Sequence, residues 1–200
     1  MGVITAAVNN ELIGVGLVLV GVAVFVVLLV KVIYYFTEKT LRPIAEGIGG
    51  RIERDGIKGP RVVVPLKTGN GIVTISQGSQ YSPPFLNLYL EHEIGFMLSI
   101  SKENFATRGL EKLGIGHEVR VNDPIFDDKY RIKSSDEMRA LNLLSDHRIR
   151  QAVDEIFERR YSQILAKKGL VLARLYNYKK TDLEPESVRA VFDALLTLVG

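Results

Sequence analysis

Three aspartates lie close together as potential metal ligands. Asp123, Asp127 and Asp128 lie in one short segment beside Pro124. Carboxylates suit hard cations, but calcium needs six or more oxygen ligands, and the segment lacks the Asp-x-Asp-x-Asp-Gly spacing with its distal glutamate. Aspartates next to a proline are also typical of turns. The three residues are therefore candidate ligands for a metal-dependent enzyme, with a structural turn as the commoner interpretation.

The histidines and nucleophiles do not form a recognisable catalytic group. His92 lies between Glu91 and Glu93, but alternate residues of a strand point to opposite faces, so His92 would point away from both acids. His117 and His147 are far from it in sequence and show no H-x-x-x-H spacing. The chain has no cysteine and no G-x-S-x-G motif. We therefore predict no catalytic residue and no cofactor, and expect a protein that is not an enzyme.

The charge of the chain is mild and mixed. It carries 26 Lys and Arg against 23 Asp and Glu, a formal net charge of +3. Four arginines lie in residues 148–160, but this stretch also contains Asp154, Glu155 and Glu158. A solvated helix face explains this mixture better than a surface for anionic lipid, and a dedicated nucleic-acid binder would carry a stronger cationic excess. We expect no nucleic-acid partner.

These residues follow a long apolar segment near the N-terminus. Residues 12–30 contain no charged or polar side chain, and fifteen of the nineteen are Leu, Ile, Val or Phe. A helix that crosses a bilayer needs about 20 such residues. Residues 31–36 extend the segment, with Lys31 able to reach the headgroups and Tyr34 and Tyr35 placed for an interfacial belt. The segment predicts a transmembrane helix over residues 12–36.

Charge on the two sides of this helix predicts its orientation. Residues 1–11 contain no Lys or Arg, whereas Lys31, Lys39, Arg42, Arg51 and Arg54 lie at its end and beyond it. The positive-inside rule places such a C-terminal side in the cytoplasm. We expect a single-pass protein of the cell membrane with its N-terminus outside and its large domain in the cytoplasm.

Two glycines mark one face of the predicted span. Gly14 and Gly21 are seven residues apart, so they share a helix face on which another helix could approach closely. A glycine simply tolerated in a lipid-facing helix explains the pattern at least as well. The bilayer is the first expected partner, and a second protein or another copy of the chain is the next.

The rest of the chain has the size of one domain. A juxtamembrane connector over residues 37–60 contains Pro43, which disfavours helix at Arg42, so we expect the helix to end near there. Residues 61–67 and 71–77 predict a β-hairpin across Gly69 and Asn70, and Pro65 suggests an edge strand or a bulge. A strand over residues 85–91 alternates two faces, and strands are expected over residues 95–102, 117–121 and 129–133.

Helices dominate the second half of this domain. Ser134 to Glu137 predict a capping box, and Asp146 is placed to cap a second helix. A hairpin over residues 161–176 and a helix that opens at Pro185 complete the chain. The predicted fold class is α+β: an N-terminal transmembrane helix followed by an antiparallel β-meander covered by helices, with residues 61–200 as the soluble domain.

One stretch of this domain resembles a known group of proteins. Asp123, Pro124, Phe126, Asp127, Tyr130, Ile132, Ser134 and Asp136 match a D-P-x-F-D-x-x-[FY]-x-[VI]-x-S-x-D pattern. The pattern is similar to one in uncharacterised, membrane-tethered domains of bacteria and archaea. That family has no assigned activity, so the resemblance implies a tethered domain of this build and no functional residue.

Three functions are compatible with these features. The first is a membrane-anchored protein whose cytoplasmic α+β domain mediates protein contacts, as an accessory or scaffold subunit of a membrane complex. The second is a domain that binds a lipid or small ligand at the bilayer surface. The third is a metal-dependent enzyme that uses Asp123, Asp127 and Asp128.

Overall fold

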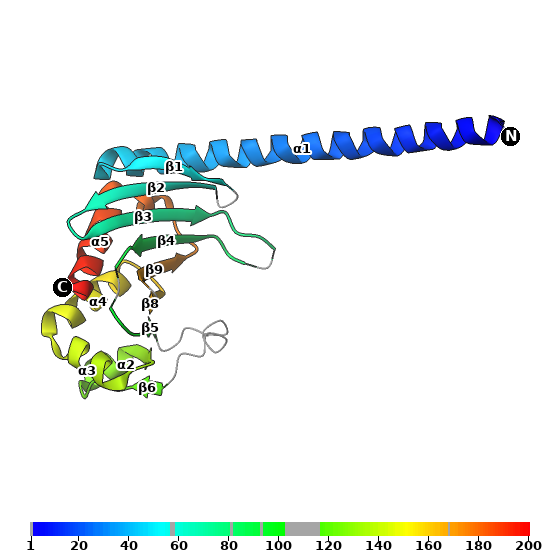
Figure 1. Ribbon diagram of the computed structural model, residues 1–200. Helices are drawn as coiled ribbons and strands as arrows, with labels where there is room; N and C mark the ends of the chain where they lie inside the picture. The colour runs from blue at the N-terminus through cyan, green and yellow to red at the C-terminus, as the bar shows by residue number, and fades with distance from the viewer. Residues whose placement is uncertain (1, 57–58, 81, 93, 103–116, 168) are drawn as a thin grey trace. The chain divides into compact units, whose positions relative to one another are not determined.

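The computed structural model describes residues 2–56, 59–80, 82–92, 94–102, 117–167 and 169–200 (Figure 1). The chain divides into two compact units, Met1–Lys39 and Thr40–Gly200. Each unit is described below by itself.

The first unit is a single helix with an apolar surface. It is the N-terminal part of α1 (Gly2–Ile48), in which the stretch Gly16–Ile48 is long and apolar enough to cross a membrane. Its large apolar side chains are exposed: Leu17 is 69% and Phe25 64% accessible. Leaving such side chains in water costs about 1.5–3 kcal/mol each. By length and composition this helix is therefore a candidate membrane anchor.

The prediction that the helix ends near Pro43 is wrong. The helix α1 runs through Pro43 to Ile48. A proline inside a helix costs about 3 kcal/mol. The same turns bury Leu41 and Ile44 completely in the core of the second unit, and burial of two such side chains offsets that cost.

A glycine ends this helix, in the segment that we expected to be a flexible connector. Gly49 has a φ of +73°, and the Gly50 amide donates to the Ala45 carbonyl oxygen at 2.8 Å. This is a Schellman-type C-cap, which favours glycine at the left-handed position. Strand β1 (Arg51–Asp55) follows at once, so residues 37–60 contain a helix end and a strand.

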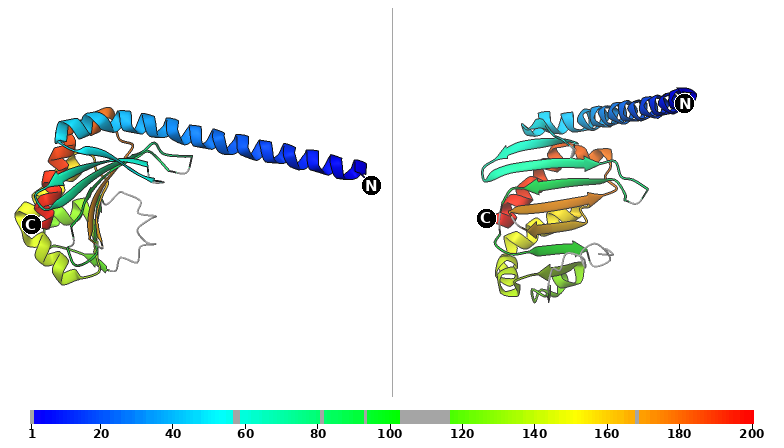
Figure 2. Two further views of the ribbon diagram at one scale, coloured as in Figure 1. Left: turned by 45° about the horizontal axis from the view of Figure 1, so that its top comes forward. Right: turned by 45° about the vertical axis from the view of Figure 1, so that its right-hand side comes forward.

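The second unit is built on one sheet, which confirms the α+β class. In the described chain it has nine strands in the order β1-β2-β3-β4-β9-β8-β5-β7-β6, and all pairs are antiparallel. The C-terminal hairpin β8–β9 lies between β4 and β5 (Figures 1 and 2). The other strands are β2 (Gly59–Leu66), β3 (Gly69–Ser76), β4 (Phe85–Leu90), β5 (Leu98–Lys102), β6 (His117–Val119), β7 (Tyr130–Ser134), β8 (Gln163–Lys167) and β9 (Leu170–Tyr176).

The predicted hairpin at Gly69 is confirmed, with its turn one residue earlier than expected. Leu66 pairs with Gly69, which has a φ of +99° and already belongs to β3. The strand β2 that contains Pro65 is not at the edge, since it pairs with β1 as well as with β3. Pro65 is tolerated because the pairing with β1 ends at Val63, so no β1 ladder bond is required of it.

Four helices follow in sequence between and after these strands. The predicted cap at Asp146 is confirmed, since its carboxylate accepts from the Arg148 amide. The predicted capping box does not form: Ser134 is the last residue of β7, and Asp136 caps α3 by accepting from the Arg139 amide. The segment that we expected to be a loop instead contains a short helix, α2, because Asp123 caps it and Pro124 starts it. The bounds are α2 (Pro124–Lys129), α3 (Glu137–Ser145), α4 (His147–Glu158) and α5 (Pro185–Val199), with the 3₁₀ turn η3 (Lys180–Leu183) before α5.

Strand pairing places one row of apolar side chains on the face of the sheet that the helices cover. Helices α4 and α5 lie together against this core face (Figure 2). Every member of the row is at most 2% exposed. The row runs across eight strands and consists of Val62, Val73, Leu88, Ala173, Ile164, Ile100, Ile132 and Val119.

Shortening Leu88 should destabilise the domain strongly. Leu88 is fully buried in a central strand, so Leu88→Ala should lower the free energy of unfolding by about 2–5 kcal/mol. Ile125→Ala is the matched control, because Ile125 is 72% exposed and should change the value by less than about 0.5 kcal/mol. Denaturation of the full chain in mild detergent, followed by near-ultraviolet circular dichroism, measures both. Equal losses from the two variants would contradict the assigned core.

Candidate functional site

The opposite face of the sheet, called the second face here, carries two parallel rows of side chains in register. A polar row crosses six strands. An apolar row, two residues away along the strands, crosses four of these six strands and also β2. The polar row is Thr74, Asn87, Arg174, Gln163, Ser101 and Arg131. The apolar row is Val63, Ile72, Tyr89, Leu172 and Leu165.

Arg174 lies at the centre of the polar row, on the fifth of the nine strands. Its Nε donates to Asn87 Oδ1 at 2.8 Å, and its Nη1 donates to the Tyr176 hydroxyl at 3.3 Å. The guanidinium also lies over the Phe85 ring, 5.1 Å from its centroid, and 5.8 Å from that of Tyr176. Two hydrogen bonds and two rings therefore fix the plane of this cation.

The hydrogen-bond chain continues from Arg174 into the apolar row. Asn87 is 2% exposed, and its Nδ2 donates to the Tyr89 hydroxyl at 2.8 Å. Tyr89 thus accepts a hydrogen bond and keeps its own hydroxyl proton available. Among the described residues, Arg174 forms no ion pair. Its positive charge is therefore held by neutral groups.

Buried polar atoms continue along the same face toward β7. Ser99 follows Leu165 in register and is 1% exposed, and its hydroxyl has no hydrogen-bond partner among the described residues. The Nε of Arg131, at the end of the polar row, is also buried and has no partner in the described ranges. Buried polar groups normally have a hydrogen-bond partner. The hydroxyl of Ser99 and the Nε of Arg131 are therefore exceptions within the described part of the domain.

Strand β5 contains a serine–lysine spacing that we did not recognise in the sequence. Ser99 and Lys102 have the Ser-x-x-Lys arrangement of some acyl-transfer enzymes. Both lie in β5, where residues three apart point to opposite faces. The strand geometry therefore separates the two side chains, and the motif does not form a catalytic pair.

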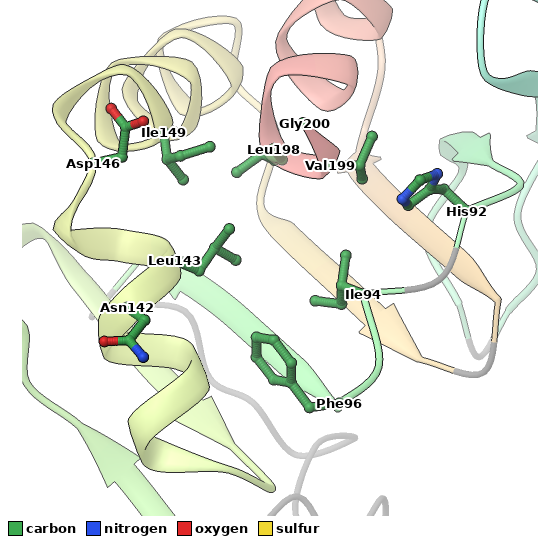
Figure 3. A pocket seen from close by; sticks show the side chains of 10 residues that line it. All are labelled: His92, Ile94, Phe96, Asn142, Leu143, Asp146, Ile149, Leu198, Val199 and Gly200. Atoms are coloured by element: carbon green, nitrogen blue, oxygen red, sulfur yellow. The ribbon is translucent and has the colours of Figure 1, made fainter.

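A second candidate site is an apolar pocket of about 360 Å³ next to the C-terminal end of α5. Ile94, Phe96, Leu143, Ile149 and Leu198 surround it (Figure 3). His92, Asn142 and Asp146 lie at its edge, with Val199 and Gly200. His92 is thus placed beside an apolar hollow. The lining suits a small apolar group.

The edge of this pocket carries a fixed negative charge. Asp146 accepts from the Arg148 side chain, with Nη2 at 2.7 Å from Oδ2, and from the Arg148 amide at 2.8 Å. The Arg148 side chain is the largest cause, and its backbone amide the next, of the lowered pKa of Asp146. The carboxylate therefore stays ionised to lower pH than an ordinary aspartate.

Two of the three candidate metal ligands have separate structural partners. Asp123 Oδ1 accepts from the Phe126 amide at 3.2 Å, and Asp127 Oδ1 accepts from the Val121 amide at 2.9 Å. Asp128 instead lines a hollow beside α4. Within the described ranges, no group of three or more His, Asp or Glu side chains is placed to hold a metal ion.

Asp154 is the carboxylate on which neighbouring side chains converge, and the sequence did not single it out for this. Its Oδ1 accepts from the Tyr130 hydroxyl at 2.7 Å and from Lys129 Nζ at 3.1 Å. Burial, and then the hydrogen bond to Asp154, raise the pKa of Tyr130. The group borders a hollow of about 460 Å³ that also contains Glu158. Tyr130 stays protonated, and Asp154 already accepts two hydrogen bonds. The pair therefore links β7 to α4 in a structural role.

The proposed contact face of the span remains a prediction. Gly14 and Gly21 both lie in α1. A side chain added at Gly21 would meet no atom within 4 Å, so this position is open in the chain as described.

Replacing Arg148 should raise the pKa of Asp146. In Arg148→Gln the main cause of the lowered pKa is lost, so the carboxyl should titrate at higher pH, closer to an ordinary aspartate. Carboxyl chemical shifts followed by NMR during a pH titration measure this. Arg159→Gln is the control, because Arg159 pairs with Glu155 instead. An unchanged titration in Arg148→Gln would show that the ion pair does not form in solution.

Comparisons with known proteins give one structural likeness. No family model matches the chain, and no curated protein matches it. The crystal structure of the mycobacterial trehalose monomycolate transport factor A, TtfA, is similar at a TM-score of 0.48 and 9% identity, over 79% of this chain and 95% of that one. Likeness at this level does not identify a family or transfer an activity, and the resemblance to membrane-tethered domains stays a prediction.

Proposed function

We propose that the chain is a single-pass membrane protein that acts through contacts between its α+β domain and other proteins, as an accessory or scaffold subunit. The observation that carries this is α1. Its stretch Gly16–Ile48 can cross a bilayer, and its apolar side chains are exposed. Only an apolar environment satisfies such a surface.

The charge distribution supports a cytoplasmic domain. Lys and Arg are absent before the span and recur from Lys31 onward. This asymmetry favours an external N-terminus and a C-terminal domain that faces the cytoplasm.

Two exposed apolar side chains support a protein-contact surface. Among the large apolar residues described in the second unit, Ile125 and Met138 stand out at 72% and 67% exposed. They lie on α2 and α3, which precede and follow β7 at the β7–β6 end of the sheet. Methionine and other large apolar residues at the centre of a contact patch are typical of protein interfaces. This end of the domain is where we place the partner.

Ligand binding is the second candidate function. The apolar pocket in Figure 3 has the volume for a small apolar ligand or the end of an acyl chain. Native mass spectrometry of the full chain released from detergent tests this. A retained ligand mass that Leu143→Trp abolishes supports the pocket, and a bare protein mass after isolation from native membranes opposes it.

Cysteine labelling should reveal the orientation. The chain has no cysteine, so single substitutions give a signal without background. A membrane-impermeant maleimide applied to intact cells should label Asn9→Cys, whereas Ser135→Cys on the domain surface should react only after permeabilisation. Labelling of Ser135→Cys from outside would reverse the proposed orientation. Loss of both variants from the membrane fraction at alkaline pH would contradict the anchor.

Polar substitutions at the exposed apolar residues should weaken partner binding without unfolding the domain. The double variant Ile125→Ser with Met138→Ser should lose about 1.5–3 kcal/mol of binding free energy for each apolar side chain that the complex no longer buries. The amount of co-purified subunit should therefore fall at least tenfold. The matched control is Glu137→Ser with Asn142→Ser on exposed positions of α3. Quantitative mass spectrometry after purification in mild detergent measures the ratio. Equal recovery with both double variants would remove this surface from the proposal.

A further inference from the structure

We infer that the second face of the sheet binds a single-chain amphiphile with a carboxylate head. The head would lie against Arg174 and Tyr89, and the chain along the apolar row. This inference goes beyond the protein-contact role and does not depend on it. It rests on the order of hydrogen-bond donors, on the charge of the face and on the register of its two rows.

The hydrogen-bond chain on this face has a donor at each end. Arg174 donates through Nε to Asn87, and Asn87 donates to Tyr89. Asn87 Nδ2 and Arg174 Nη1 each use one of their two N–H groups, and among the described residues neither Nη2 of Arg174 nor the Tyr89 hydroxyl proton has an acceptor. Donors at both ends call for an acceptor with two oxygens, which a carboxylate supplies.

The charge of the central face also favours an anion. Among the described residues no carboxylate forms an ion pair with Arg174, and the buried Nε of Arg131 lies three strands away in the same row. The acids described on this face have other partners: Glu53 is bound to Arg51 and Arg61, Glu118 is opposite Lys133, and Glu91, two residues after Tyr89, accepts from Asn70 Nδ2 at 2.8 Å. The row through Arg174 is therefore cationic and uncompensated, and an anionic head would complement it.

The apolar row explains why the ligand needs a chain as well as a head. Leu172 follows Arg174 by two residues on β9, which places it about 7 Å away on the same face. Leu172, Leu165, Tyr89 and Met97 form a cluster separate from the main core. With Val63 and Ile72 in register, apolar side chains continue across five strands, or about 19 Å.

The fixed plane of Arg174 selects the head group. A guanidinium held by Asn87 and by the rings of Phe85 and Tyr176 offers its remaining edge in one orientation. Planar carboxylates match that edge with two parallel hydrogen bonds, and a preset cation loses little entropy on binding. A neutral alcohol of the same chain length lacks both the charge and the second acceptor.

Photolabelling of the full chain in neutral maltoside micelles tests the inference. The probe is hexadecanoic acid with a diazirine in mid-chain, and the matched control probe is the corresponding hexadecanol. After irradiation, digestion and mass spectrometry should locate the acid on β4, β8 and β9, at least fivefold above the alcohol. Unlabelled hexadecanoic acid should displace the label, and hexaglutamate should not.

Substitutions separate the head site from the general apolar surface. Arg174→Gln should reduce labelling of these strands about tenfold, since it removes a charge-assisted pair of hydrogen bonds. Tyr89→Phe keeps the ring and removes one donor, so it should reduce labelling severalfold and carries the test if Arg174→Gln does not fold. Arg148→Gln, at an 81% exposed side chain on α4, should leave labelling unchanged.

Several results would overturn the inference. Equal labelling by acid and alcohol would mean that the face is only apolar. A label located mainly outside β4, β8 and β9, or unaffected by both Arg174→Gln and Tyr89→Phe, would place binding elsewhere. Displacement by hexaglutamate as effective as by hexadecanoic acid would identify an acidic protein segment as the occupant instead.

Discussion

The domain depends on strand register held across the whole sheet. Each of the eight strand pairings is antiparallel and in phase, so every strand sends its alternate residues to the same two faces. A slip of one residue in β9 would exchange Ala173 for Arg174 and put a guanidinium into the helix-covered core. The register of the strands therefore produces both the buried row through Leu88 and Ile100 and the polar row through Arg174.

The two faces then serve different purposes. Helices α4 and α5 cover the core face, so nearly all of its apolar side chains are inaccessible to water. The second face carries a cation held by neutral groups and buried polar atoms that lack partners. A buried polar group left unmatched destabilises a domain, so replacing Ser99 with alanine should cost the fold little. Asn87 differs from Ser99, because Arg174 and Tyr89 satisfy both ends of its amide.

Much of this architecture was predictable from local patterns, and the rest depended on distant contacts. Alternation identified the faces of β4, and Asp146 and Pro185 marked helix starts correctly, because capping and pleating act over a few residues. The prediction based on Pro43 was wrong, because burial of Leu41 and Ile44 outweighs the tendency of a proline to end a helix. The site on the second face could not be predicted from the sequence, because Asn87 and Arg174 are 87 residues apart and meet only through the pairing of β4 with β9. Polar residues at alternate positions of apolar strands, such as Asn87 and Gln163, were the signal available.

The position of the hairpin β8–β9 bears on how the protein is made. Strands β1 to β4 pair with one another in order, but β4 and β5 each complete their pairing only with strands formed by residues 163–176. During synthesis the apolar helix emerges first, whereas the sheet stays in two open halves until the last forty residues leave the ribosome. The edges of β4 and β5 are then exposed beside the growing chain. Late closure of this kind makes the nascent domain a natural client for chaperones.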